Sequence, residues 1–143
     1  MRELVSLHKH WLNADSVKQF VSSKIEVNET VPDGLSQTAQ MLSSFSRLTV
    51  LYGLIYVVIE GYKELKFSNE AIDELLAQED FVDALRLFRN STFHYQKEPI
   101  SEKALKFLEL PESEKWIQQV HIAFRKYFEE ELSIKEIMSQ INA

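Results

Sequence analysis

Residues 87–96 read LFRNSTFHYQ, and this stretch holds the side chains best suited to chemistry. Arg89 and Asn90 are adjacent, and His94 follows shortly after them. Arginine offers a planar set of N–H donors that matches phosphate oxygens, and histidine exchanges a proton near neutral pH. Asparagine can orient a hydroxyl or a phosphate oxygen. Together they could cleave a phosphodiester without metal, with Arg89 stabilising charge and His94 moving the proton. The alternative is that they are bystanders, which exposed arginine and histidine pairs commonly are.

A helical wheel, on which each residue turns by about 100°, divides the side chains from Phe81 to Tyr95 between two faces. The predicted core face holds Phe81, Ala84, Leu85, Phe88, Thr92 and Tyr95. The other face holds Arg86, Arg89, Asn90 and His94, together with Val82 and Phe93. Because a solvated face should lack Val82 and Phe93, we expect a second surface there, either a subunit interface or a cleft. Arg86 and Phe93 are therefore candidates for phosphate or interface contacts.

Size and composition predict an ordinary globular domain. A chain of 143 residues with 45% hydrophobic and 27% charged residues fits a single domain over residues 1–143. The lack of cysteine excludes disulfides and thiolate metal sites. A net charge of -6 argues against broad electrostatic binding of nucleic acid, so any RNA would have to be held locally. The first residues do not resemble a secretory signal, and we expect a cytoplasmic location.

Periodicity predicts an all-α bundle of about five to seven helices. Only three glycines and three prolines occur, and few windows alternate with the period of a strand. Residues 3–26, whose apolar stripe runs as far as Ile25, form one amphipathic helix or two in tandem. In the second case Ser16 and Gln19 make a capping box at the break. Residues 28–34, NETVPDG, are the clearest loop.

A long helix should follow this loop to about residue 65. Its middle, residues 50–59, is apolar on every side, which suits a central helix surrounded by others. A stretch of ten residues is shorter than the roughly 20 needed to cross a bilayer, so we expect no membrane partner.

Local signals divide the second half of the chain into shorter helices. Ser68 or Asn69 can cap a helix over 70–78, and Pro99 should end the helix that carries the motif. Residues 101–110 form another helix, and Pro111 suits the first turn of the next. At the end of the chain, a capping box of Ser133 and Glu136 opens a terminal helix.

The segment RNSTFH, at residues 89–94, resembles the motif of the HEPN superfamily: arginine, a polar residue, three residues and histidine. The helical pattern and the length also resemble HEPN domains, which are compact helical bundles. Many HEPN proteins are metal-independent endoribonucleases of toxin or antiphage-defence systems, with a composite active site where two subunits meet. The resemblance implies that Arg89 and His94 are catalytic and that Asn90 polarises or positions. Gln96 stands where HEPN toxins paired with a nucleotidyltransferase antitoxin often carry tyrosine.

Other polar residues carry weaker signals. On a helix His8 and His10 point about 200° apart and cannot share a metal. His121 lies beside a predicted core stripe and is expected to be structural or exposed. We therefore expect neither a cofactor nor a metal.

Two functions remain open at this stage, and whether the chain is an enzyme stays undecided between them. The first is a homodimeric endoribonuclease that cleaves RNA and has an antitoxin or defence protein as partner. The second is a non-catalytic HEPN-like module that binds a partner protein or a nucleotide through the same face.

Overall fold

The computed structural model, described for residues 1–24, 26 and 30–142, is all-helical over that part of the chain. The side chains of residues 134 and 136 lie outside this description. The helices within it are α1 (Arg2–Lys18), α2 (Asp33–Glu64), α3 (Glu70–Leu76), α4 (Glu79–Phe93), α5 (Glu102–Glu109), α6 (Ser113–Glu131) and α7 (Ile134–Ile141). The predicted all-α bundle is confirmed.

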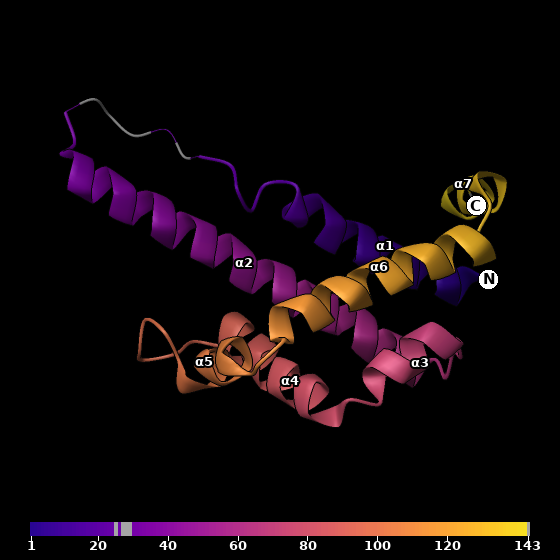
Figure 1. Cartoon of the computed structure of the whole chain (residues 1–143). Helices are drawn as coiled ribbons and strands as arrows, with labels where there is room; N and C mark the ends of the chain where they lie inside the picture. The colour runs from indigo at the N-terminus through magenta and orange to yellow at the C-terminus, as the bar shows by residue number, and fades with distance from the viewer. Residues whose placement is uncertain (25, 27–29, 143) are drawn as a thin grey trace.

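Helix α2 is the axis of the bundle (Figure 1). Helices α1 and α4 both pack along it, α5 packs on α4, and α6 closes the bundle against α1, α3 and α5. Helix α7 lies beside the start of α1, so the two ends of the chain are at the same end of the molecule (Figure 1). The motif helix α4 is therefore held between α2 and α5.

Aromatic side chains fill the core where α2, α4 and α5 meet. Phe88 and Phe107 are both fully buried, with ring centroids 5.8 Å apart and nearly perpendicular. Tyr52 of α2 contacts both rings, at 5.6 Å and 5.7 Å. Burial of one such aromatic side chain stabilises the fold by roughly 1.5–3 kcal/mol. This cluster fixes the rotation of α4 and hence the direction in which its polar side chains point.

The first half of α2 projects beyond α4, α5 and α6 (Figure 1) and leaves apolar side chains uncovered. Leu35 and Met41 are 64% and 65% exposed, and Leu42 is also exposed. Among the described residues, α2 is the one helix whose length and mean hydropathy of 1.6 would allow it to cross a membrane. The apolar stretch is thus longer than the ten residues considered above. A buried core helix passes the same test, and the middle of α2 contributes buried residues to the core, so this is weak evidence for a membrane span.

Two expectations for the first helix differ from the structure. Helix α1 ends at Lys18, before residue 26, and Ile25 lies outside the described residues. Of the two alternatives, the one with a break at Ser16 is wrong, because α1 continues through this residue and Ser16 Oγ donates to the Leu12 carbonyl oxygen at 2.8 Å. A serine inside a helix can bond the preceding turn instead of capping a new helix.

Helix ends elsewhere follow the local signals in part. Asn69 caps α3, with its side-chain oxygen accepting from the Ile72 amide at 3.1 Å, and Ser101 caps α5. The Pro111 prediction is wrong, because α6 begins two residues later, after Glu112 in left-handed geometry (φ 68°).

Two further expectations reach outside the described residues. Part of the predicted loop at 28–34 does so, although α2 begins at Asp33, within that segment. The side chain of Glu136 does so as well, so its predicted capping role has no structural description.

Candidate functional site

The motif lies on the last turns of α4 and just beyond its end. Acidic residues Glu79 and Asp80 occupy the first turn, where they favour the positive end of the helix dipole. The helix ends at Phe93, and His94 has extended backbone angles (φ -117°, ψ 145°). The helix was expected to continue through Tyr95 and to be ended by Pro99; it ends two residues before Tyr95, so Pro99 does not end it. Arg89 and Asn90 are positioned by a helix, whereas His94 is positioned by the segment that leaves it.

Arg89 is held from three directions by its own chain. Its Nη1 lies 3.0 Å from Oε2 of Glu60, and its Nε donates to Oδ1 of Asn90 at 3.0 Å. The guanidinium carbon lies 4.9 Å from the ring centroid of Tyr56, in cation–π geometry. The side chain remains 25% exposed, and in the described part of the chain Nη2 has no hydrogen-bond partner. Arg89 is thus oriented while part of its donor set still faces solvent.

Glu60 and Tyr56 are site residues that the sequence analysis missed. Both lie on α2, one helical turn apart. A signal was present, because Glu60 is the only charged residue between Arg47 and Lys63. A lone carboxylate in such an apolar stretch predicts a specific partner.

The ionisation of Tyr56 reflects the same neighbours. Burial, followed by the charge of Glu60, raises the pKa of Tyr56, and the charges of Arg89 and Arg86 oppose this. The phenol therefore stays neutral at physiological pH and acts as a surface on which Arg89 stacks.

His94 is exposed and lies apart from this arrangement. Its backbone N–H donates to the Asn90 carbonyl oxygen at 3.1 Å, and no hydrogen-bond or ionic partner holds its ring among the described residues. Within this part of the chain, no polar contact joins the Arg89 guanidinium to the His94 imidazole. The structure brings Arg89 and Asn90 together and leaves the His94 imidazole exposed, without a polar partner among the described residues.

The helical wheel placed two side chains on the wrong face. Tyr95 was expected in the core but is 91% exposed, because the helix ends before it and the wheel no longer applies. Val82 was expected on the second face but is only 5% exposed and belongs to the core. The reason is that α4 packs against both α2 and α5, so its buried arc is wider than one face.

The two contact candidates differ in their surroundings. Arg86 is exposed. Phe93 is 48% exposed, and its ring lies against α2 at Gly53, where an added Cβ would come within 2.8 Å of the ring carbon Cε2. Part of the expected second surface is therefore α2 of the same chain.

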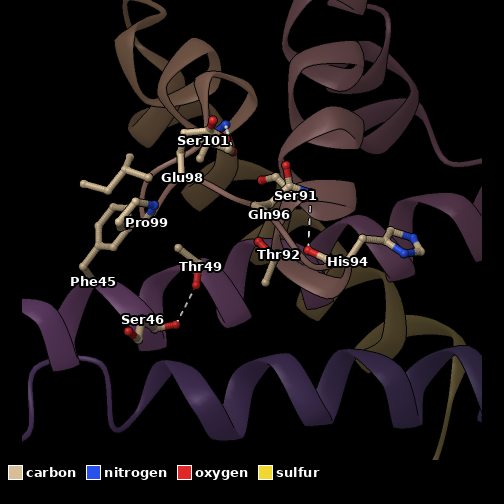
Figure 2. Close-up of a pocket in the computed structure, with 12 residues that line it drawn as sticks. Phe45, Ser46, Thr49, Ser91, Thr92, His94, Gln96, Glu98, Pro99 and Ser101 are labelled. Carbon is tan, nitrogen blue, oxygen red and sulfur yellow. Dashed lines mark hydrogen bonds between the residues drawn. The ribbon is translucent and has the colours of Figure 1, made fainter.

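A cavity of about 310 Å³ adjoins the end of the motif (Figure 2). It lies between α2 and the segment that connects α4 to α5, and His94 is one of its lining residues. Figure 2 shows the His94 ring directed away from the other lining side chains. His94 therefore stands at the edge of the cavity, with its ring outside it.

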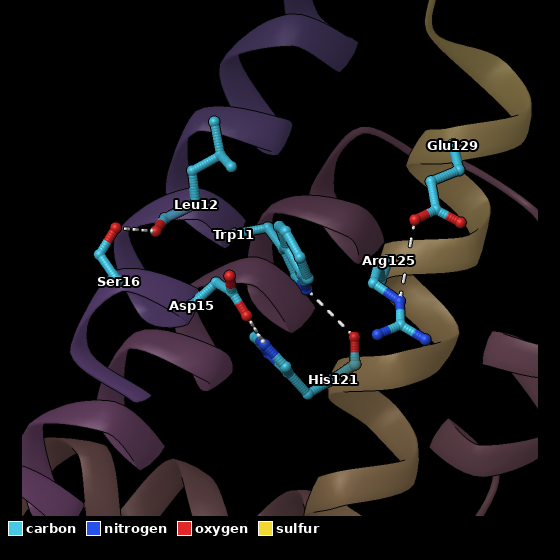
Figure 3. Close-up of polar contacts among 7 residues, drawn as sticks. All are labelled: Trp11, Leu12, Asp15, Ser16, His121, Arg125 and Glu129. Atoms are coloured by element: carbon cyan, nitrogen blue, oxygen red, sulfur yellow. Dashed lines mark hydrogen bonds and ion pairs between the residues drawn. The ribbon is translucent and has the colours of Figure 1, made fainter. Parts of the chain in front are cut away.

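The histidine at position 121 is buried and structural (Figure 3). Its Nε2 lies 3.0 Å from Oδ1 of Asp15, and its ring stacks on Trp11 with centroids 4.8 Å apart. The Trp11 indole N–H donates to the backbone oxygen of His121 at 3.1 Å. These contacts fasten α1 to α6. His8 also packs in this region, with its ring 4.9 Å from that of Phe128.

Within the described part of the chain, no three His, Asp or Glu side chains group as metal ligands would. Comparison with protein-family models, with curated proteins and with solved structures finds no match for this chain. Functional inference therefore rests on the motif, the fold and the contacts described above.

Proposed function

We propose that this protein is a metal-independent endoribonuclease of toxin or antiphage-defence type, acting as a homodimer with Arg89 and His94 in a composite site. The observation that carries the proposal is the state of Arg89. Glu60, Asn90 and Tyr56 orient its guanidinium, yet the side chain remains 25% exposed and Nη2 has no hydrogen-bond partner in the described part of the chain. A preoriented cation at the surface suits charge that develops on a phosphate during reaction.

The proposed chemistry begins at the ribose 2′-hydroxyl. His94 takes the proton of this hydroxyl, and the oxygen attacks the adjacent phosphorus. The bond from phosphorus to the 5′ oxygen of the next nucleotide breaks, that oxygen accepts a proton from water, and the protonated His94 returns its proton to solvent. The products are a 2′,3′-cyclic phosphate and a 5′-hydroxyl. Arg89 stabilises the added negative charge on the phosphate oxygens.

A second copy of the chain has two roles in this proposal. It brings an arginine near the histidine of its partner, since Arg89 and His94 of one chain are not joined by any described polar contact. It also covers apolar surface, because Leu35, Met41 and Leu42 are exposed on the projecting half of α2. Contiguous exposed apolar surface commonly marks an interaction site.

One observation favours a second function, a non-catalytic HEPN-like module that binds a partner protein or nucleotide. Glu60 offsets the charge of Arg89. Through its contacts with Glu60 and Tyr56, Arg89 connects α4 to α2. In this alternative the motif stabilises the fold and presents a surface for a partner.

Cleavage of total RNA by the purified protein in EDTA separates the two functions. We expect cleavage that is lost in Arg89→Ala and in His94→Ala. Matched controls are Arg125→Ala, which removes an exposed arginine of α6, and His10→Ala, which removes an exposed histidine of α1. Full activity in either motif variant would contradict the proposal, and the lack of any cleavage by the unaltered protein would favour the binding module. A cytoplasmic location and an antitoxin or defence partner belong to the same proposal.

A further inference from the structure

The cavity at the end of the motif differs in character from the Arg89 site. Its volume of about 310 Å³ is at the lower end of the roughly 300–1,000 Å³ of small-molecule sites. Phe45, Pro99, Ile100 and Ala104 supply apolar lining. Ser46 and Thr49 of α2 lie across from Ser91 and Thr92 of α4 (Figure 2). The cavity thus combines apolar walls with hydroxyl groups from two helices.

Three of the five hydroxyls that line the cavity donate to backbone oxygens and are therefore acceptors toward a ligand. Thr49 Oγ1 donates to the Ser46 carbonyl oxygen at 2.7 Å. Ser91 Oγ and Thr92 Oγ1 donate to the Phe88 carbonyl oxygen at 2.8 Å and 3.0 Å. A hydroxyl has one proton to donate. Each of these three groups donates that proton to a backbone oxygen of its own helix, so its lone pairs remain available to accept a hydrogen bond.

Two further groups add to the acceptor character of the lining. Gln96 Nε2 donates one of its two N–H bonds to the His94 carbonyl oxygen at 3.3 Å, and the Gln96 side-chain oxygen can accept from a ligand. Glu98 contributes a carboxylate, and none of the described lining residues is arginine or lysine. Phosphate binding favours positive charge, so a lining that has a carboxylate and neither arginine nor lysine disfavours it. A neutral, flat group that carries N–H donors fits better.

We propose that this cavity is the base pocket of the nuclease and binds an RNA nucleobase that carries an amino group. The inference rests on the proposed function, because it assigns a base next to the phosphate that Arg89 and His94 would contact. Cytosine, adenine and guanine carry an amino donor on their edges, whereas uracil has a carbonyl acceptor where cytosine has its amino group. Proteins that recognise single-stranded RNA bind unstacked bases on aromatic side chains and hydrogen-bond their edges. Phe45 supplies the aromatic wall.

The position of His94 links the pocket to the reaction. His94 lines the cavity, but its ring points away from the other lining residues (Figure 2). A nucleotide whose base occupies the cavity therefore has its sugar and phosphate at the cavity edge, on the side of the imidazole. The pocket would select the base, and the motif would act on the neighbouring phosphodiester.

The test measures nucleoside binding, so it does not depend on cleavage. Cytidine and uridine are titrated separately into the 143-residue protein, and its amide chemical shifts are followed by NMR. We expect cytidine to bind about tenfold more tightly than uridine, since the difference corresponds to about one hydrogen bond. Thr49→Val removes an acceptor at nearly constant shape, and Glu98→Gln replaces one by a donor on the exposed connecting segment. Each variant should reduce the preference for cytidine.

A matched control lies on the same helix. Thr38 is exposed, and its Oγ1 donates to the Gly34 carbonyl oxygen at 3.1 Å, as Thr49 does within its own turn. Thr38→Val should leave the preference unchanged. Equal binding of cytidine and uridine would contradict the assignment of the cavity as a base pocket. An unchanged preference for cytidine in both Thr49→Val and Glu98→Gln would contradict it as well. A short oligodeoxycytidylate, which lacks the 2′-hydroxyl and cannot be cleaved, should bind more tightly than cytidine; equal binding would overturn the assignment to a base within a strand.

These outcomes separate the pocket from the nuclease. If His94→Ala abolishes RNA cleavage but nucleosides bind without preference, the pocket is wrong and the nuclease stands. If cytidine is preferred but no RNA is cleaved, the base pocket stands and the nuclease is wrong.

Discussion

Arg89 of α4 and Glu60 of α2 form an ion pair, with 3.0 Å between Nη1 and Oε2. The pair joins the motif helix to the central helix at a point where both side chains still reach solvent, at 25% and 48% exposure. An ion pair with this exposure contributes little to stability, typically about 1 kcal/mol or less. Its more important effect is on the direction in which the Arg89 guanidinium points.

Replacement of Glu60 tests this positioning role. We expect Glu60→Ala to lower RNA cleavage by about tenfold, because a misdirected arginine stabilises the reacting phosphate less well. Glu60→Gln keeps an oxygen that can accept from Nη1 and should recover part of the activity. Urea unfolding of both variants should show a loss of about 1 kcal/mol or less. Glu129→Ala, at the exposed and longer pair of Arg125 with Glu129 (3.9 Å), is the control and should change neither quantity. Normal cleavage by Glu60→Ala would argue that Glu60 does not position Arg89.

Mixing of two inactive variants tests whether the site is shared between subunits. In a mixed dimer of Arg89→Ala and His94→Ala, one composite site combines an intact Arg89 with an intact His94. After unfolding and joint refolding we therefore expect part of the activity to return. Each variant refolded alone should stay inactive. Failure to regain activity, with mixed dimers shown to form by mass spectrometry, would place both residues of a working site in one chain.

Two glycines of α2 should respond differently to alanine. At Gly61 an added Cβ would lie 2.7 Å from Cδ1 of Leu7, which is only 3% exposed and cannot move aside. We expect Gly61→Ala to destabilise the protein by about 1–3 kcal/mol, since overpacking shifts buried groups. At Gly53 the close neighbour is the Phe93 ring, which is 48% exposed and can swing outward.

Gly53→Ala should therefore be nearly neutral or stabilising by up to about 1 kcal/mol, because alanine favours helix. The free energy of unfolding in urea measures both effects. A larger loss in Gly53→Ala than in Gly61→Ala would contradict the packing described here.

His121 should make stability depend on pH. Burial lowers the pKa of His121 below 6.5; the hydrogen bond that its ring donates to Asp15 opposes this shift, and the charges of Lys18 and Arg125 add to it. The unfolded state therefore binds a proton more readily than the folded state. The contribution is complete above about pH 6.5 and is lost as the pH falls through the folded pKa. His8, whose pKa burial also lowers, contributes with the same sign.

Urea midpoints at about pH 7.5 and about pH 5.5 measure this effect around the unperturbed pKa of histidine. His121→Gln keeps a polar partner for Asp15 without a titrating group, so the midpoint should fall less on acidification than in the unaltered protein. His10→Gln changes an exposed histidine and should leave the pH dependence as it was. An identical fall in His121→Gln and in the unaltered protein would exclude His121 as the source.

Local patterns in the sequence determined the helical class and several helix ends. Few glycines and prolines, with apolar residues at helical spacing, predicted the bundle and the long helix that is now α2 (Asp33–Glu64). The caps at Asn69 and Ser101 were also predictable, because a cap depends on residues within one turn. The motif at residues 89–94 could be recognised by residue type alone.

Only the tertiary structure decided what surrounds that motif. Glu60 and Tyr56 contact Arg89 because α2 packs along α4. The spacing of residues along the sequence does not predict which helices pack together. The burial of Val82 and the exposure of Tyr95 have related causes. A helical wheel assumes one buried face and an unbroken helix, whereas α4 is covered by two neighbours and ends at Phe93. Contacts between distant segments depend on how the helices fill the core, and that packing exists only in the folded chain.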